Sequence, residues 1–353
     1  MRNRMKFKKI ALLLIVLAAT VSCVHEWPVP APANVILHLN FEGELPQGPT
    51  MDFTTKADAP DNYDLRYIIE VYPETGDGKY DQDTPYARYV YSKADISSLD
   101  STITLNIMEG KYLFRVWADY VDNGSLEDKY YNADRFKYVK LLGRNENLPH
   151  TANTDYRDAF TGYTEIEVIR FGPKHPPVEG RIKMKRPVSK VVIITTDLDI
   201  WKTKVLVNMY ESMLQGSKAG ETGNVELPTT VNLDDYVVKI HYPIYMPNAY
   251  NLIEDNTAWS DQDVTFESKL IQLNKEEASM GFDYVFAKPI DPRVDIAVSL
   301  HTKDGVQLAR SQNMTIILEQ GKVTTVKGSF LLEKSDGGVS INPDFEGEFN
   351  ITI

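Results

Sequence analysis

The sequence predicts a mainly β protein made of two tandem antiparallel β-sandwich domains, with one or few short helices. First, short segments alternate apolar and polar residues with a period of two, which puts successive side chains on opposite faces of a strand. Second, these segments are rich in aromatic residues, turn residues separate them, and helical periodicity is scarce. Third, a break of glycine and proline at Gly172 to Pro177 divides a chain long enough for two domains of the usual ~100 to 200 residues.

Residues 1–22 are predicted to be a lipoprotein signal peptide. An apolar run from Ile10 to Val21 ends at Ser22-Cys23, the only cysteine in the chain, and five basic residues precede it: Arg2, Arg4, Lys6, Lys8 and Lys9. As a helix this run covers roughly 18 Å, which is too short for the roughly 30 Å of bilayer hydrocarbon. We therefore expect cleavage before Cys23 and a lipid on its thiol, which would tether the protein to the bilayer. An ordinary secretory leader that contains a cysteine is the alternative.

A proline-rich tether is expected at residues 23–34. Pro28, Pro30 and Pro32 stand at alternate positions, where they prevent both a helix and a central strand. The tether would hold the first domain away from the membrane.

The charge of the chain excludes one class of partner. Without the five basic residues of the leader, 33 lysines and arginines face 50 aspartates and glutamates, a net charge of −17. Such an acidic body should be repelled by nucleic acid and by anionic lipid headgroups, so contact with the bilayer would come from acylated Cys23 alone. With Cys23 lipidated, no thiol remains for a disulfide or a thiolate metal site.

The N-terminal sandwich is predicted to span residues 35–172. Strand patterning begins at Val35, where Val35, Leu37 and Leu39 share one face, and it recurs from Arg66 to Tyr72 and from Thr102 to Met108. Glu109-Gly110 reads as a tight turn into a strand from Tyr112 to Asp119, which predicts a hairpin.

The C-terminal sandwich is predicted to span residues 178–353. Its expected strands are Arg181 to Lys185, Lys190 to Thr196, Tyr236 to Tyr242, Val264 to Leu270, Phe282 to Phe286, Val294 to His301, Met314 to Leu318, Val323 to Leu331 and Phe349 to Ile353. The last of these alternates Phe349, Ile351 and Ile353, and we expect it to be an integral strand of this domain and not a strand donated to another subunit.

One helix is predicted, from Asp199 to Leu214. Trp201, Val205, Met209 and Met213 are spaced by four residues, and Asp199 is a suitable N-cap. The helix is expected to cover an edge or an end of a sheet.

No motif in the sequence indicates an enzyme. A nucleophile elbow, a phosphate loop, a dinucleotide fingerprint and a His-Glu-x-x-His helix are all absent. The six histidines stand far apart, so surface or core positions are favoured over catalysis or metal binding: His25, His38, His150, His175, His241 and His301. The prediction is therefore a protein that is not an enzyme, with no catalytic residue, no metal site and no cofactor.

Two groups of residues leave room for binding. Acidic loops at Asp77, Asp81 and Asp83 and at Asp119, Asp122, Asn123 and Asp128 could hold calcium, although their spacing does not match an EF-hand and solvated turns are favoured. Aromatic residues gather at Trp117, Tyr120, Tyr130, Tyr131, Phe136 and Tyr138, where they could stack sugar rings beside Asp119 or Asp128. Packing in the core of a sandwich uses the same residues and is the favoured interpretation.

Several motifs resemble a known group of proteins. They include Arg115-Val116-Trp117-Ala118-Asp119-Tyr120-Val121, Asp155-Tyr156-Arg157-Asp158-Ala159-Phe160-Thr161-Gly162, Tyr242-Pro243-Ile244-Tyr245-Met246-Pro247-Asn248-Ala249-Tyr250-Asn251 and Phe282-Asp283-Tyr284-Val285-Phe286. Together they are similar to the fimbrillin-like and fimbrial anchor-type lipoproteins of the Bacteroidales. This resemblance implies transthyretin-like, Greek-key sandwiches, export to the outer membrane, and fimbrial subunits as partners through β-strand addition. No arginine follows Cys23 until Arg66, which favours an anchor or accessory subunit over a proteolytically processed stalk subunit.

The leading hypothesis is therefore a lipid-anchored structural protein of the outer membrane, facing the cell surface, that takes part in fimbria assembly and adhesion. The alternative is a glycan-binding surface lipoprotein of a polysaccharide-uptake system. The fold alone does not decide between the two.

Overall fold

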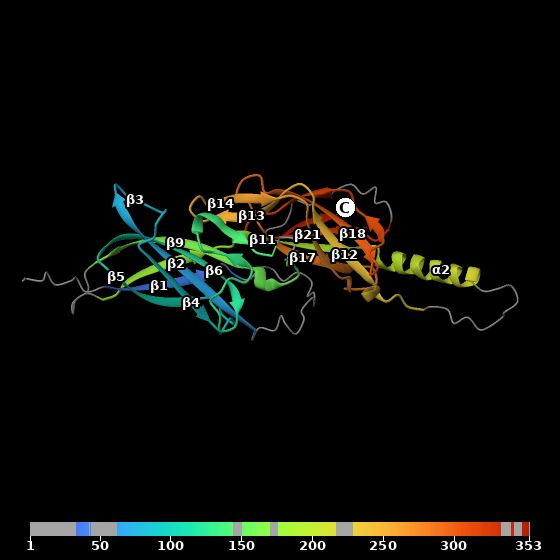
Figure 1. Ribbon diagram of the computed structural model, residues 1–353, viewed down its shortest axis with the longest axis horizontal. Helices are drawn as coiled ribbons and strands as arrows, with labels where there is room; N and C mark the ends of the chain where they lie inside the picture. The colour runs from blue at the N-terminus through green and yellow to red at the C-terminus, as the bar shows by residue number, and fades with distance from the viewer. Residues whose placement is uncertain are drawn as a thin grey trace, which may run out of the picture.

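The computed structural model describes residues 33–41, 43, 62–143, 150–169, 176–216, 229–332, 340–341 and 348–352. Figure 1 shows an elongated, mainly β protein in which two sandwiches follow one another along the long axis, with helix α2 beyond the second. The mainly β class and the tandem sandwiches agree with the prediction from the sequence. The signal peptide, Cys23 and nearly all of the tether lie outside the described residues.

The N-terminal sandwich packs two sheets face to face. The first has the strand order β10-β1-β5, and the second has the order β3-β2-β6-β9 with β4 also paired to β2. The strands are β1 (Ala33–Phe41), β2 (Tyr63–Gly76), β3 (Lys79–Tyr80), β4 (Ala87–Lys93), β5 (Ser101–Ile107), β6 (Gly110–Asp122), β9 (Ala159–Val168) and β10 (Val178–Met184). Leu37, Ile103, Leu105 and Phe114 lie in the apolar core between the sheets, as the alternation predicts.

The predicted hairpin at Glu109-Gly110 is wrong. Strand β5 pairs with β1, whereas β6 pairs with β2 and β9 in the opposite sheet. The short turn therefore carries the chain across the core from one sheet to the other, and Gly110 has a φ of 150° at that crossing. Period-two patterning places side chains on faces and does not say which strand is the neighbour.

The expected start of the C-terminal domain is also corrected. Residues 172–175 of the expected boundary lie outside the described residues. Strand β10, which was expected to open the second domain, pairs in parallel with β1 from Val35↔Val178 to Phe41↔Met184. Ile182 and Met184 are buried in the N-terminal core. The three-stranded sheet of the first sandwich thus takes one edge strand from beyond the break, and the chain enters the second sandwich only after Lys185.

The C-terminal sandwich packs a sheet of order β16-β17-β11-β21-β23-β22 on a sheet of order β15-β12-β18-β19, in which β20 also pairs with β18. The strands are β11 (Val188–Thr195), β12 (Tyr236–Tyr242), β15 (Val264–Ser268), β16 (Ile271–Gln272), β17 (Ala278–Phe286), β18 (Arg293–Thr302), β19 (Gln307–Arg310), β20 (Met314–Ile317), β21 (Val323–Gly328), β22 (Ser340–Ile341) and β23 (Glu348–Thr352). Pairing is mostly antiparallel, although β11 and β23 both run parallel to β21.

The C-terminal strand is integral to this sandwich. Strand β23 pairs with β21 from Val323↔Glu348 to Lys327↔Thr352, and β22 pairs with its other edge. The prediction that the last segment belongs to the second domain is confirmed.

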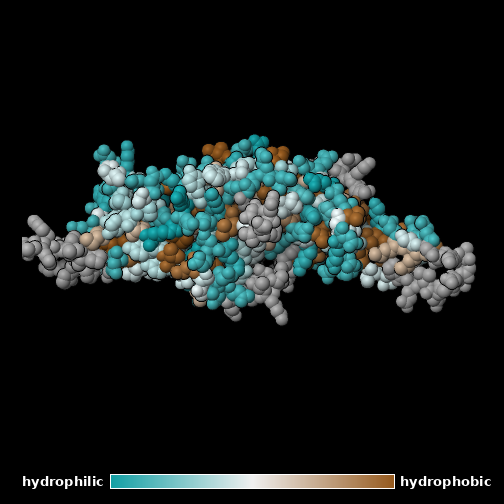
Figure 2. Space-filling view, in the orientation of Figure 1, coloured by the Kyte–Doolittle hydropathy of each residue, from teal (hydrophilic) through white to brown (hydrophobic). Residues whose placement is uncertain are grey.

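Helix α2 (Leu198–Gly216) exists as predicted but does not cover a sheet. Leu198 and Trp201 are buried, whereas Val207, Tyr210 and Leu214 are exposed. Figure 1 shows the helix projecting from the end of the C-terminal sandwich, and Figure 2 shows brown, apolar residues where it leaves that body. In the described part of the chain, α2 included, no helix combines the length and apolarity needed to cross a membrane.

A fifth sheet, the bridging sheet, joins the two halves. Its order is β14-β13-β8-β7, with β7 (Tyr131–Asn132) and β8 (Val139–Leu141) from the first half and β13 (Met246–Asn251) and β14 (Asn256–Asp261) from the second. Its inner face adds Tyr131, Val139 and Tyr250 to the core of the C-terminal sandwich. The halves are therefore interlocked twice, through this bridging sheet and through β10.

Candidate functional site

The aromatic residues singled out from the sequence mostly fill the core. Trp117, Tyr131 and Phe136 are almost completely buried, and the Trp117 ring meets that of Tyr131 edge-on with centroids 5.3 Å apart. Tyr120 is half-buried against Tyr156. The core interpretation is confirmed for these residues, and of the predicted group only Tyr138 is exposed.

Asp119 and Asp128 are not available to bind a sugar, because both carboxylates pair with Arg66. Arg66 donates from Nη2 to Asp119 Oδ2 at 2.7 Å and from Nη1 to Asp128 Oδ1 at 2.8 Å. Burial alone would lower the pKa of Arg66, but the hydrogen bonds and charges of these two carboxylates outweigh it and raise that pKa. The cluster is a set of ion pairs on the face of β2 and β6 opposite the core of the first sandwich, a role that its sequence spacing does not reveal.

The acidic loops also pair with cations of the chain itself. Asp83 contacts Lys137, and Asp122 contacts Lys129. Among the described residues, no group of three or more histidine, cysteine or acidic side chains is arranged to hold a metal ion.

Two of the predicted histidines meet through a serine. His241 Nε2 lies 2.8 Å from Ser299 Oγ, and the same oxygen lies 2.9 Å from His301 Nε2. Burial, followed by the charge of Arg310, lowers the pKa of His241 to about 4, so the ring is neutral at pH 7. Ser299 is fully buried against the two imidazoles, so its hydroxyl is not open to a substrate. His25 and His175 lie outside the described residues.

One group of buried charges lies between the two halves. Arg157, which follows β8 in the first half, donates to Asp283 Oδ1 on β17 at 2.5 Å, and His150 Nε2 lies 2.8 Å from Asp283 Oδ2. Tyr242 donates to the same carboxylate at 3.0 Å. Burial alone would raise the pKa of Asp283, but Arg157 and His150 hold it below its ordinary value. This buried network fastens the halves together and has no access to a ligand.

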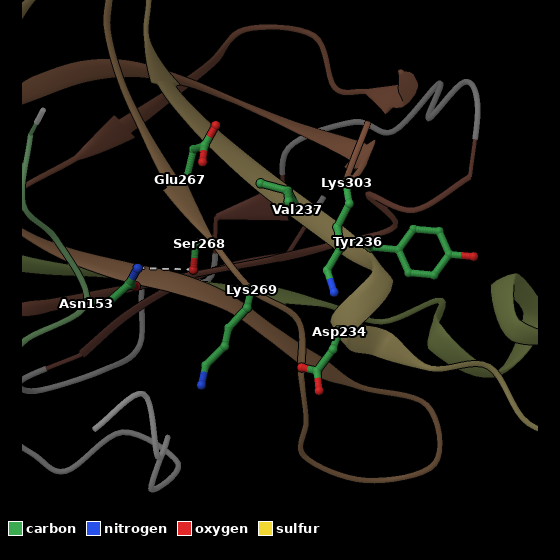
Figure 3. A pocket seen from close by; sticks show the side chains of 8 residues that line it. All are labelled: Asn153, Asp234, Tyr236, Val237, Glu267, Ser268, Lys269 and Lys303. Carbon is green, nitrogen blue, oxygen red and sulfur yellow. Dashed lines mark hydrogen bonds between the residues drawn. The ribbon is translucent and has the colours of Figure 1, made fainter. Parts of the chain in front are cut away.

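A hollow of about 640 Å³ lies at the open end of the C-terminal sandwich (Figure 3). Its lining residues are Asn153, Asp234, Tyr236, Val237, Glu267, Ser268, Lys269 and Lys303. The Asn153 amide donates to Ser268 Oγ at 3.1 Å, which fixes both side chains. Lys303 lies 3.7 Å from Asp235, and Lys239 lies 3.0 Å from Glu267. Two of the four charged lining side chains, Glu267 and Lys303, are therefore paired with charges outside the hollow.

A second hollow, of about 590 Å³, lies on the bridging sheet. Trp259 is 56% exposed and Tyr138 39% exposed, and their rings lie 5.7 Å apart. Lys140 Nζ lies 4.6 Å from the centre of the Trp259 ring. Asn132, Asp134 and Arg135 also line this hollow. Sequence reasoning missed Trp259, although a lone tryptophan in the polar run Asn256 to Asp261 could have drawn attention to it.

Comparison with known proteins gives a family and a set of similar structures. The model of a family of unknown function, DUF6562, matches residues 32–353. No curated protein matches the chain.

Solved structures from Bacteroides and Porphyromonas species are similar to this chain at low sequence identity. A candidate polysaccharide-binding protein from Bacteroides thetaiotaomicron is 13% identical with a TM-score of 0.44, and the match covers 78% of each chain. A candidate cell adhesion protein from Bacteroides eggerthii is 13% identical with a TM-score of 0.42, over 92% of this chain and 99% of that one. The fimbrial anchor protein Mfa2 from Porphyromonas gingivalis is 12% identical with a TM-score of 0.37, over 79% and 82%. At these identities, function must be argued from the residues of this chain.

Proposed function

The chain belongs to DUF6562, the family of unknown function whose model it matches over residues 32–353, and we propose that it is a non-enzymatic, lipid-anchored protein of the cell surface. Its role in this proposal is that of an anchor or accessory subunit in fimbria assembly and adhesion. Its partners are the outer membrane, through acylated Cys23, and fimbrial subunits, through strand addition at a sheet edge.

The observation that carries the proposal is the use of the buried polar groups. In an enzyme, titratable side chains with shifted pKa values converge on a cleft. Here Arg66 pairs with Asp119, and Arg157 pairs with Asp283, inside the body. Arg115 of β6 donates to the carbonyl oxygen of Leu252 at 2.7 Å across the two halves. This arrangement favours a load-bearing scaffold over a catalyst.

Attachment is supported by the sequence. The predicted leader, residues 1–22, directly precedes Cys23, the single thiol, and the prolines that follow would serve as a spacer before β1. A lipid on Cys23 provides an attachment that the acidic body, repelled by anionic headgroups, would not otherwise have.

A strain that lacks the gene, complemented with wild-type or variant protein, tests the proposal. The wild-type chain is expected to incorporate labelled fatty acid, to sediment with the outer membrane and to restore cell attachment and fimbriae. Cys23→Ala should be released from membranes and should fail to restore attachment, whereas Trp259→Ala, with its leader intact, is the matched control for fractionation. Membrane-bound Cys23→Ala would contradict the anchor, and a gene-deleted strain that attaches and keeps its fimbriae like its parent would contradict the role.

Glycan binding by a surface lipoprotein is the second candidate function. Most of the residues that the sequence suggested for it are buried, but Tyr138, which belongs to that group, forms an exposed aromatic pair with Trp259.

A further inference from the structure

The hollow on the bridging sheet is built by one row of residues that crosses all four strands. Asn132 of β7 lies opposite Lys140 of β8, Lys140 lies opposite Ala249 of β13, and Ala249 lies opposite Trp259 of β14. Residues directly opposed across strands share a face of the sheet. Asn132, Lys140 and Trp259 of this row are at least partly exposed and Ala249 is buried, so both halves of the chain contribute side chains to the same face.

The opposite face of the same sheet is buried, which fixes the orientation of the row. Tyr131, Val139 and Tyr250, each adjacent in sequence to a member of the row, are all fully buried in the core. Because side chains alternate along a strand, Asn132, Lys140 and Trp259 must point to solvent. Ala249, the small member of the row, leaves room for the Lys140 side chain to reach the Trp259 ring.

Tyr138 supplies a second aromatic wall. It ends the short helix η3 (Phe136–Tyr138), whose Phe136 is buried and whose Phe136 carbonyl oxygen accepts from Leu252 N at 2.8 Å. These contacts hold η3 to the second half of the chain, so the Tyr138 and Trp259 rings are placed by the fold. Large exposed aromatic side chains held in this way are typical of recognition surfaces.

The polar groups of the hollow have a distinct charge. Arg135 and Lys140 face a single acidic lining residue, Asp134, which accepts from Asn132 Nδ2 at 2.9 Å. This excess of positive charge stands out in a chain whose net charge is −12. The volume of about 590 Å³ falls in the range of small-molecule sites, roughly 300 to 1,000 Å³.

We propose that this hollow binds an acidic saccharide, whose ring lies against Trp259 and Tyr138 and whose carboxylate pairs with Lys140 and Arg135. The C–H groups of a sugar ring suit the negative face of an aromatic ring. The amide of Asn132 and the carboxylate of Asp134 are donor and acceptor for sugar hydroxyls. The lining combines four polar or charged residues with Tyr138, Trp259 and two leucines, Leu141 and Leu142, and this mixture suits a ligand that carries both hydroxyls and C–H faces.

The inference rests on the proposed role at the cell surface for its biological setting, but its test does not. Binding is measured on the full chain purified in detergent, so it does not depend on attachment or adhesion in cells. A failure to bind the saccharide would likewise not contradict the proposed anchor.

Isothermal titration calorimetry with a galacturonate tetramer, its methyl ester and a neutral glucose tetramer tests the proposal. The acid should bind more tightly than the ester and the neutral sugar. Trp259→Ala should weaken binding of the acid by about tenfold or more. Lys140→Gln should weaken it by about threefold and reduce the preference over the ester, as expected for one exposed charge.

Tyr163→Ala is the matched control, because Tyr163 is a similarly exposed aromatic residue with Arg115 over its ring. It should bind the acid like the wild-type chain. Thermal unfolding of every variant should match the wild type, since the altered side chains are exposed. No binding of the acid, or binding that Trp259→Ala does not weaken, overturns the site, and equal binding of acid and ester overturns its charge selectivity.

Discussion

Single charged residues decide how firmly the two halves are joined. Arg157, Asp283 and Tyr242 are fully buried and come from both sides of the junction. A buried ion pair contributes little compared with an apolar pair, but removing one partner leaves a buried charge without compensation.

We therefore expect Arg157→Met to lower the free energy of unfolding by about 3 to 5 kcal/mol. The double variant Arg157→Met/Asp283→Asn should recover part of this loss, because it removes the orphaned carboxylate as well. Urea unfolding followed by tryptophan fluorescence measures both. A loss for the single variant within ~0.5 kcal/mol, the range of an ordinary surface substitution, would show that the network does not hold the halves together.

His241 predicts a pH dependence of stability. Its pKa of about 4 in the folded chain lies below the ordinary value of ~6.5 that it has when unfolded. Between these values the unfolded chain binds a proton that the folded chain does not, so the free energy of unfolding falls as the pH drops from about 6.5 to about 4. The slope from this residue is at most ~1.4 kcal/mol per pH unit, and is reduced because the ring is partly exposed.

The variant His241→Gln should flatten the stability profile in that window while keeping a polar partner for Thr265 and Ser299. Chemical denaturation at a series of pH values measures the slope. A profile as steep as that of the wild type would assign the dependence to other groups.

Among the secondary-structure elements, the positions of the strands were predicted better than the partners with which the strands pair. The faces of β1 and β5 follow directly from their alternation, and the final strand and the helix were found where they were expected. The partners of β5, β6 and β10 were not predictable, because alternation carries no information about which sheet a strand joins. The projection of α2 was missed because its spacing of apolar residues by four is typical of a packed helix.

Close packing of β9 against β10 explains one glycine. A Cβ on Gly162 would lie 2.6 Å from the carbonyl oxygen of Lys183 and 2.7 Å from Ile182 Cγ2. Backbone cannot move aside as a flexible side chain can. Strand β10 can therefore pack this closely on β9 only because residue 162 has no side chain.

Gly162→Ala should therefore destabilise the chain by about 1 to 3 kcal/mol through overpacking. Gly43→Ala is the matched control, because its Cβ would meet no atom within 4 Å and should leave stability unchanged. Thermal unfolding compares the two variants. Equal melting temperatures for both would show that β10 does not lie so close to β9.

At the scale of the whole molecule, the candidate site was the least predictable feature. Trp259 and Tyr138 are more than 100 residues apart in sequence, and Ala249 between them carries no chemical signal. Only the pairing of β8 with β13 brings the two rings together. The sequence did indicate the aromatic richness of the first half, but most of those side chains form the core.

The scaffold role and the site on the bridging sheet both depend on the interlocking of the two halves. Residues 23–171 and 172–353, produced separately and together, test it most directly by circular dichroism and size-exclusion chromatography. Because β10 belongs to the second piece and completes the first sandwich, we expect each piece alone to be unstable and the two together to elute as one folded complex. If the two pieces fold independently and do not associate, the halves are not interlocked and the chain consists of two separable tandem domains.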